Sequence, residues 1–252
     1  MCKVYFLVFV MALSGRTAFG QAEVEARTNV ILPDGRRNLV VANHSNKTIT
    51  AFAYHVTFLV GSDPERAWDE FQDNVLLPGE RAVLPGEVLS MPAGIRFHSA
   101  LEQKKTIVST ADFRAAVFDD GSAFGDPAWV ARIRDRRLLV IQMLDAQIAA
   151  LRAASAKVAG GGVTIDALAD QFRTDEAARM KGYSDRDRQQ LVRMCYDSAL
   201  TNLDKDIPDR PVAERLERVR RAIQISRDRI AKGAGISPGA PENESAPPAR
   251  RQ

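Results

Sequence analysis

The sequence is poor in the residues that stabilise small disulfide-rich proteins and bind most transition metals. Only 2 of its 252 residues are Cys, only 3 are His, and aromatic residues make up 7%. With so few Cys, the fold must be held together by hydrophobic cores alone. The chain also lacks the repeats of collagen-like and mucin-like proteins and the long apolar stretches of multi-pass membrane proteins. What remains, 45% hydrophobic and 27% charged residues, is the composition of an ordinary globular protein.

Residues 1–20 have the features of an export signal. Lys3 provides a positive charge, residues 4–13 form an uncharged apolar run, and small residues precede Gln21 at positions −3 and −1. The run is shorter than the roughly 20 residues of a membrane-spanning helix. We therefore expect cleavage before Gln21 and a periplasmic or secreted mature chain with no transmembrane segment. Because Arg16 lies close to the cleavage site, retention of the segment as an N-terminal anchor is the alternative.

Cleavage would remove Cys2 and leave Cys195 as the one thiol of the mature chain. A single thiol forms no intramolecular disulfide. Two interpretations of Cys195 remain open at this point. It is either a small apolar side chain packed on a helix face, which is common for free Cys, or a reactive thiol that links two chains. Its helical context favours the first.

Residues 26–122 alternate between apolar and polar positions, which predicts strands. The clearest run has its large apolar side chains on one face and smaller or polar ones on the other: Phe52, Tyr54, Val56 and Phe58 against Ala53, His55 and Thr57. A second run places Phe113, Ala115 and Val117 on one face. Turn signals separate the runs. Short strands at this spacing predict an antiparallel β-sandwich of the immunoglobulin or fibronectin-like type.

Residues 127–232 instead repeat every three or four positions, which predicts helices. Asp126 is a favourable N-cap and Pro127 suits the first helical position. The first helix should run for about 32 residues, or about 48 Å, with Arg137 interrupting its apolar stripe.

Three more helices are predicted after it, at residues 164–181, from Ser184 to Pro208, and from Pro211 onward. Ser184 and Asp187 have the spacing of a capping box. These helices would form a bundle or a long hairpin with two shorter helices. Residues 233–252 are rich in Pro and Gly and should be disordered. The predicted fold class is thus α+β, in two parts.

Charge differs between the two parts. Residues 21–130 contain 10 Lys and Arg against 15 Asp and Glu, whereas residues 131–232 contain 21 against 15. A basic excess favours contact with an acidic partner or an anionic surface. Solvated helix faces with ion pairs four residues apart, such as Glu214–Arg218 and Glu217–Arg221, would explain the same content. Nucleic acid is not expected, because few aromatic residues accompany the Arg runs and acidic residues interleave them.

No catalytic or metal-binding motif stands out. The three histidines, His44, His55 and His98, have no partner at the sequence spacing of metal ligands. The acidic cluster of Asp204, Asp206 and Asp209 lacks the Gly and the closing Glu of a calcium loop. Residues 235–239 match the letters of a nucleophile elbow but lie in the predicted disordered tail. We therefore predict no catalytic, cofactor-binding or metal-ligating residues and no cofactor.

The junction between the two parts carries a resemblance. It reads Phe118-Asp119-Asp120-Gly121-Ser122 followed by Gly125-Asp126-Pro127, and an Asn-x-Ser loop lies at residues 43–45. With the export signal, these features resemble uncharacterised exported bacterial proteins that join an immunoglobulin-like or fibronectin-like sandwich to an Arg-rich helical segment. The resemblance covers roughly residues 28–140. It implies export and this architecture, and it assigns no site residues.

These observations favour an exported, non-enzymatic binding or structural module of the cell envelope. An envelope protein or an anionic surface would be the partner, contacted through a sheet edge or the exposed face of the long helix. The alternative is a periplasmic hydrolase-type enzyme with its site where the sandwich meets the helices. The residues available for such a site are His98, Asp119, Asp120 and Asp126.

Overall fold

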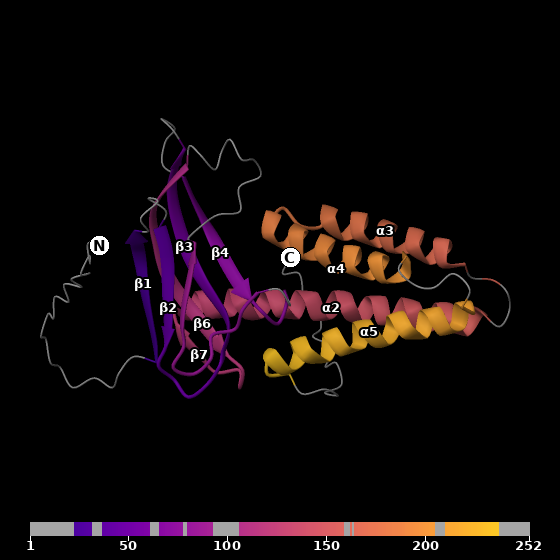
Figure 1. Cartoon of the computed structure of the whole chain (residues 1–252). Helices are drawn as coiled ribbons and strands as arrows, with labels where there is room; N and C mark the ends of the chain where they lie inside the picture. Colours follow the sequence, from indigo (N-terminus) through magenta and orange to yellow (C-terminus); the bar gives the residue numbers. More distant parts are fainter. Residues whose placement is uncertain are drawn as a thin grey trace, which may run out of the picture.

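A computed structural model describes residues 23–31, 37–60, 66–77, 80–92, 106–158, 162, 164–204 and 210–236. Strands form the first half of this chain and helices the second, as Figure 1 shows. This confirms the predicted α+β class. Residues 1–20 lie outside the described residues, so the export signal remains a prediction. The described part includes the first residues of the predicted disordered tail, where Ile236 packs against the helical core.

The strands form two antiparallel sheets, which together we call the sheet part. The first sheet has the order β1-β2-β5, with β1 at Val24–Ile31, β2 at Arg37–Asn43 and β5 at Val88–Pro92. The second sheet has the order β4-β3-β6-β7, with β3 at Ile49–Val60, β4 at Arg66–Asp73, β6 at Thr106–Phe118 and β7 at Ala123–Gly125. Each strand pairs antiparallel with its neighbours, as the period-two pattern predicted.

The first half of β3, residues 49–54, is buried on both faces. Phe52, Tyr54 and Val56 join a buried cluster that also contains Leu39 and Val41 of the other sheet, so their predicted core side is confirmed. Ala53, predicted on the polar side, is fully buried as well. That part of the prediction is wrong because a helix covers this face, and small side chains let the helix backbone approach the sheet closely.

A β-bulge in β6 overturns the predicted face of Phe113. Tyr54 pairs with Phe113 and Ala53 with Ala115, so Arg114 is an extra residue without a partner across the ladder. An extra residue reverses the alternation of faces from that point. Phe113 therefore packs in the cluster between the two sheets. Ala115 and Val117 lie on the opposite face of β6, against α2.

Four helices form the helical part: α2 at Pro127–Val158, α3 at Ile165–Lys181, α4 at Arg186–Asp204 and α5 at Val212–Gly233. The amide of Ala128 donates to Asp126 Oδ1 at 2.8 Å, which confirms the predicted N-cap. At α4 the cap is one residue later than predicted. The Asp187 amide donates to the side chain of Asp185 rather than to Ser184, because the carboxylate lies immediately before the first helical residue.

The start of α2 packs on the second sheet, and the rest of the helix extends away from it between α5 and the α3–α4 hairpin (Figure 1). Val130 and Ile133 contact the small residues of β3 and β6. Helix α2 is long and apolar enough to cross a membrane by length and composition, whereas we predicted no such stretch after the signal. Half of its apolar window is buried inside the protein, which is typical of the core helix of a globular bundle.

Candidate functional site at the junction of sheets and helices

Arg137, the residue that interrupts the apolar stripe of α2, is fully buried where the two parts meet. Its guanidinium donates from Nε to Asp73 Oδ2 at 2.8 Å and from Nη2 to Asp73 Oδ1 at 3.1 Å. Nη2 also donates to Thr50 Oγ1 at 3.0 Å, and Nη1 donates to the carbonyl of Gly233. One side chain of α2 thus joins β3, β4 and the end of α5. A planar guanidinium is suited to this because its donors have a fixed fork geometry.

The groups that receive Arg137 are themselves held in place. Asp73 Oδ1 also accepts from the amides of Val75 and Leu76, at 3.0 and 3.3 Å. Thr50 Oγ1 donates to the Val117 carbonyl at 3.1 Å. A buried charge that is paired and hydrogen-bonded in this way has a structural role, and we do not expect it to act as an acid, a base or a nucleophile. We call Arg137, Asp73, Thr50 and the Gly233 carbonyl the buried clamp.

A second cluster lies at the same junction, nearer the surface. His55 Nδ1 lies 2.7 Å from Asp69 Oδ1, and Arg132 Nη1 donates to Asp69 Oδ2 at 2.6 Å. The Arg132 guanidinium lies 4.6 Å from the ring centre of Trp129 and 4.9 Å from that of Phe71. Cation–π contacts are attractive also for an arginine that is partly exposed, as Arg132 is. They attach the first turns of α2 to β3 and β4.

The stack of arginines and rings continues on both sides. The Arg136 guanidinium also lies over Phe71, 4.4 Å from the centre of its ring. It forms an ion pair with Asp187. Arg114, the bulge residue, lies 5.9 Å from the ring centre of Trp129. The arginine–aromatic stack is therefore Arg114, Trp129, Arg132, Phe71 and Arg136.

The charges around this stack nearly balance. Burial raises the pKa of Asp69, but hydrogen bonds from His55 and Arg132 outweigh it and leave the pKa below its usual range. Asp69 therefore stays ionised at neutral pH and fixes both of its partners. A hollow of about 60 Å³ adjoins the stack and is lined by acidic and basic side chains together: Phe71, Arg132, Asp135, Arg136, Leu139, Asp185, Asp187 and Arg188. Pockets for small molecules are typically several hundred Å³, so this hollow is small for a substrate.

Of the four residues proposed for a hydrolase, the three that the structure describes have separate partners. Asp126 caps α2. Asp120 forms an ion pair with Lys47 at 2.9 Å and accepts from the Ser122 amide at 2.9 Å, and these hydrogen bonds lower the pKa of Asp120 well below its usual range. The amide of Asp119 donates to the Thr48 carbonyl. His98 lies outside the described residues.

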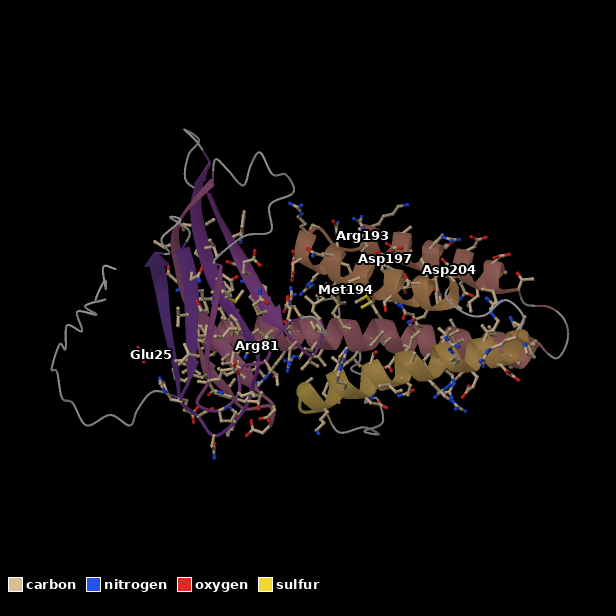
Figure 2. The ribbon with its side chains drawn as sticks, in the orientation of Figure 1. Glu25, Arg81, Arg193, Met194, Asp197 and Asp204 are labelled. Carbon is tan, nitrogen blue, oxygen red and sulfur yellow. The ribbon has the colours of Figure 1, made fainter. Side chains whose placement is uncertain are left out.

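The remaining polar candidates are also separate. His44 lies 3.3 Å from Glu25 of the edge strand β1 (Glu25 is labelled in Figure 2). Asp204 ends α4 in the helical part (Figure 2), while Asp206 and Asp209 lie outside the described residues. Residues 237–239 of the elbow-like sequence are also outside them. Among the residues that the structure describes, no three His, Cys, Asp or Glu side chains are grouped to hold a metal ion.

Cys195 is expected to be unreactive in the folded protein. The side chain is 5% exposed in the helical core, and burial raises the pKa of its thiol to about 12. At pH 8 roughly one thiol in ten thousand would be ionised, and the thiolate is the nucleophile. Native protein should therefore resist iodoacetamide, whereas protein unfolded in urea should be alkylated fully. Rapid labelling of the native chain, read by mass spectrometry, would contradict this placement.

Comparison with known proteins gives no relative: no family model, curated protein or solved structure matches this chain.

Proposed function

We propose that this chain is an exported, non-enzymatic binding module of the cell envelope. In this proposal the sheet part is a sandwich of the immunoglobulin or fibronectin-like type, and the helical part carries a contact surface. Two features support the sandwich. The sheets have three and four antiparallel strands, and one buried cluster combines residues of both, such as Val41 and Phe52.

The observation that carries the proposal is the rigid junction. The buried clamp and the arginine–aromatic stack engage the charged groups there with one another, across α2 and the strands. These contacts engage the carboxylates of Asp69 and Asp73 and connect the helices to the sheets in one direction. A fixed arm is useful to a protein that presents surfaces to partners. Export itself is supported by residues 1–20, and N-terminal sequencing of the exported chain should begin at Gln21.

A hydrolase would use the His55–Asp69 pair, because a carboxylate that orients an imidazole is part of many hydrolytic triads. The other described contact of the His55 ring is the edge of Trp129, at 6.5 Å between centres. An aromatic ring is no nucleophile, so we assign the pair to attachment of α2. Any esterase or phosphatase activity of the purified chain should therefore be unchanged by His55→Ala.

The binding function is tested with the mature chain as bait. Immobilised protein at micromolar concentration is exposed to an envelope extract of the source cell, and bound protein, lipid and glycan are analysed separately. We expect at least one component to be enriched over a matched column of heat-denatured chain. Equal recovery on both columns would refute the binding proposal.

A further inference from the structure

Helix α5 has one face in the core and one in solvent. Its inward residues, Leu216, Val219, Ile223 and Ile230, are at most 4% exposed. The outward positions follow at steps of three or four residues along 22 residues of helix, so they form one stripe. We call Arg218, Arg221, Ile225, Arg229 and Lys232 the α5 basic stripe.

Charge on this stripe is predominantly positive. Arg218, Arg221, Arg229 and Lys232 are exposed, and the one acidic residue among the exposed positions of α5 is Glu214, at the beginning of the helix. Glu217, at the margin, forms ion pairs with Arg220 and Arg221 at 2.7 and 2.8 Å and offsets part of that charge. In the C-terminal half of the stripe Arg229 and Lys232 lie beside one partly exposed carboxylate, Asp228, which pairs with Arg227 at 3.6 Å.

Ile225 lies at the centre of the stripe, one helical turn from Arg221 and from Arg229. It is 70% exposed, the highest value among the large hydrophobic residues of the described chain that are exposed. Leu216, Val219 and Ile223 are buried on the same helix, so a solvent-facing Ile is not needed for the core. An apolar side chain flanked by Arg221 and Arg229 is complementary to a surface that is anionic outside and apolar just beneath.

We propose that the α5 basic stripe binds the surface of an anionic phospholipid bilayer, with Ile225 entering the boundary between headgroups and acyl chains. This inference rests on the proposed binding function and names its partner. A hydrophilic polyanion would match the arginines and lysine but not Ile225, whereas an anionic bilayer matches both. The inward face of α5 stays packed, so binding is peripheral and reversible and needs no unfolding.

The expected strength follows from the number of charges. Each Lys or Arg near an anionic membrane contributes about fivefold to partitioning, so R229Q/K232Q should weaken binding about 25-fold. Ile225→Ala removes apolar contact and should weaken it about fivefold to tenfold. Salt should weaken the wild-type protein further, because the Debye length falls from about 30 Å at 0.01 M to about 8 Å at physiological ionic strength.

The test uses co-sedimentation of the mature chain with vesicles at low salt. One set contains equal parts of phosphatidylglycerol and phosphatidylcholine, and the other contains phosphatidylcholine alone. The matched control is K181Q/R193Q, which removes the same two charges from exposed positions on α3 and α4, across α2 from α5 (Figure 1; Arg193 is labelled in Figure 2). Circular dichroism melts establish that every variant is folded.

Support requires binding to the anionic vesicles alone, with the loss in R229Q/K232Q and not in K181Q/R193Q. Failure of the wild-type chain to sediment with anionic vesicles would overturn the lipid proposal. So would equal loss in both double variants, or binding to an acidic polysaccharide without binding to vesicles. In each of these cases an envelope component enriched on the bait column would leave the broader binding function standing.

Discussion

Arg137→Met is expected to lower the free energy of unfolding by about 3–5 kcal/mol, because it leaves the buried carboxylate of Asp73 without its cation. Asp73 is 2% exposed, so water cannot replace the guanidinium without opening the junction. The substitution also removes the donors to Thr50 and to the Gly233 carbonyl. Urea unfolding followed by circular dichroism measures the loss.

A double variant separates the charge from the shape of the site. Asp73→Asn keeps an oxygen that accepts from the amides of Val75 and Leu76, and it removes the negative charge. R137M/D73N should therefore be more stable than the sum of the two single losses predicts. The matched control is Arg134→Met, since Arg134 lies on the same helix but is exposed, with a bond to the Gly121 carbonyl at 2.8 Å. Arg134→Met should change stability by less than about 1 kcal/mol, and a similar loss from Arg137→Met would disprove the role of the clamp.

Gly125→Ala is the second large expected effect, at about 3–5 kcal/mol. Gly125 has φ of 101°, a conformation that costs a residue with a Cβ about 1–3 kcal/mol. A Cβ there would lie 2.3 Å from the carbonyl oxygen of Arg114 and 2.8 Å from the Cα of Ala115. Both are backbone atoms of β6 and cannot rotate away. The same carbonyl accepts from the Asp126 amide at 2.9 Å, so the substitution also disturbs the start of α2.

Substitutions at two other glycines separate the cost of backbone strain from the cost of the steric clash. Gly86 has φ of 74° and nothing within 4 Å of an added Cβ, so Gly86→Ala should cost about 1 kcal/mol from backbone strain alone. Gly162 has open space and no positive φ, so Gly162→Ala should be neutral or slightly stabilising. Thermal and urea unfolding should show a much lower free energy of unfolding for Gly125→Ala than for the other two variants. If Gly125→Ala and Gly86→Ala lose the same free energy of unfolding, the close approach of Gly125 to β6 does not contribute to stability.

The sequence predicts the elements well because each has a local cause. Alternation in β3 and the three- and four-residue steps of α2 depend on neighbours in the chain, and so does the Asp126 cap. The face of β6 on which Phe113 lies is not determined by neighbours in the chain. Its phase depends on the bulge at Arg114, which exists only in relation to β3. Likewise Ala53 is buried by a helix that begins more than seventy residues later.

The candidate site was harder to predict. Arg137 was visible as a charge within an apolar stripe, which is the signal for a buried partner. The partner itself was not visible, because Asp73 lies 64 residues away and the Gly233 carbonyl 96 residues away in the other direction. His55 and Asp69 are likewise brought together by strand pairing. Sequence spacing carries no information about contacts that pairing and helix docking create.

The Arg137 side chain contacts residues that are made at very different times during synthesis of the chain. The guanidinium joins residues near position 50 to the end of α5, so its last ligand is made only when almost the whole polypeptide exists. Contacts of such long sequence separation form late. Until then the Arg137 guanidinium can pair with Asp73 and Thr50, which are made earlier, but it lacks its acceptor on α5, so the junction between the sheets and the helices is completed last.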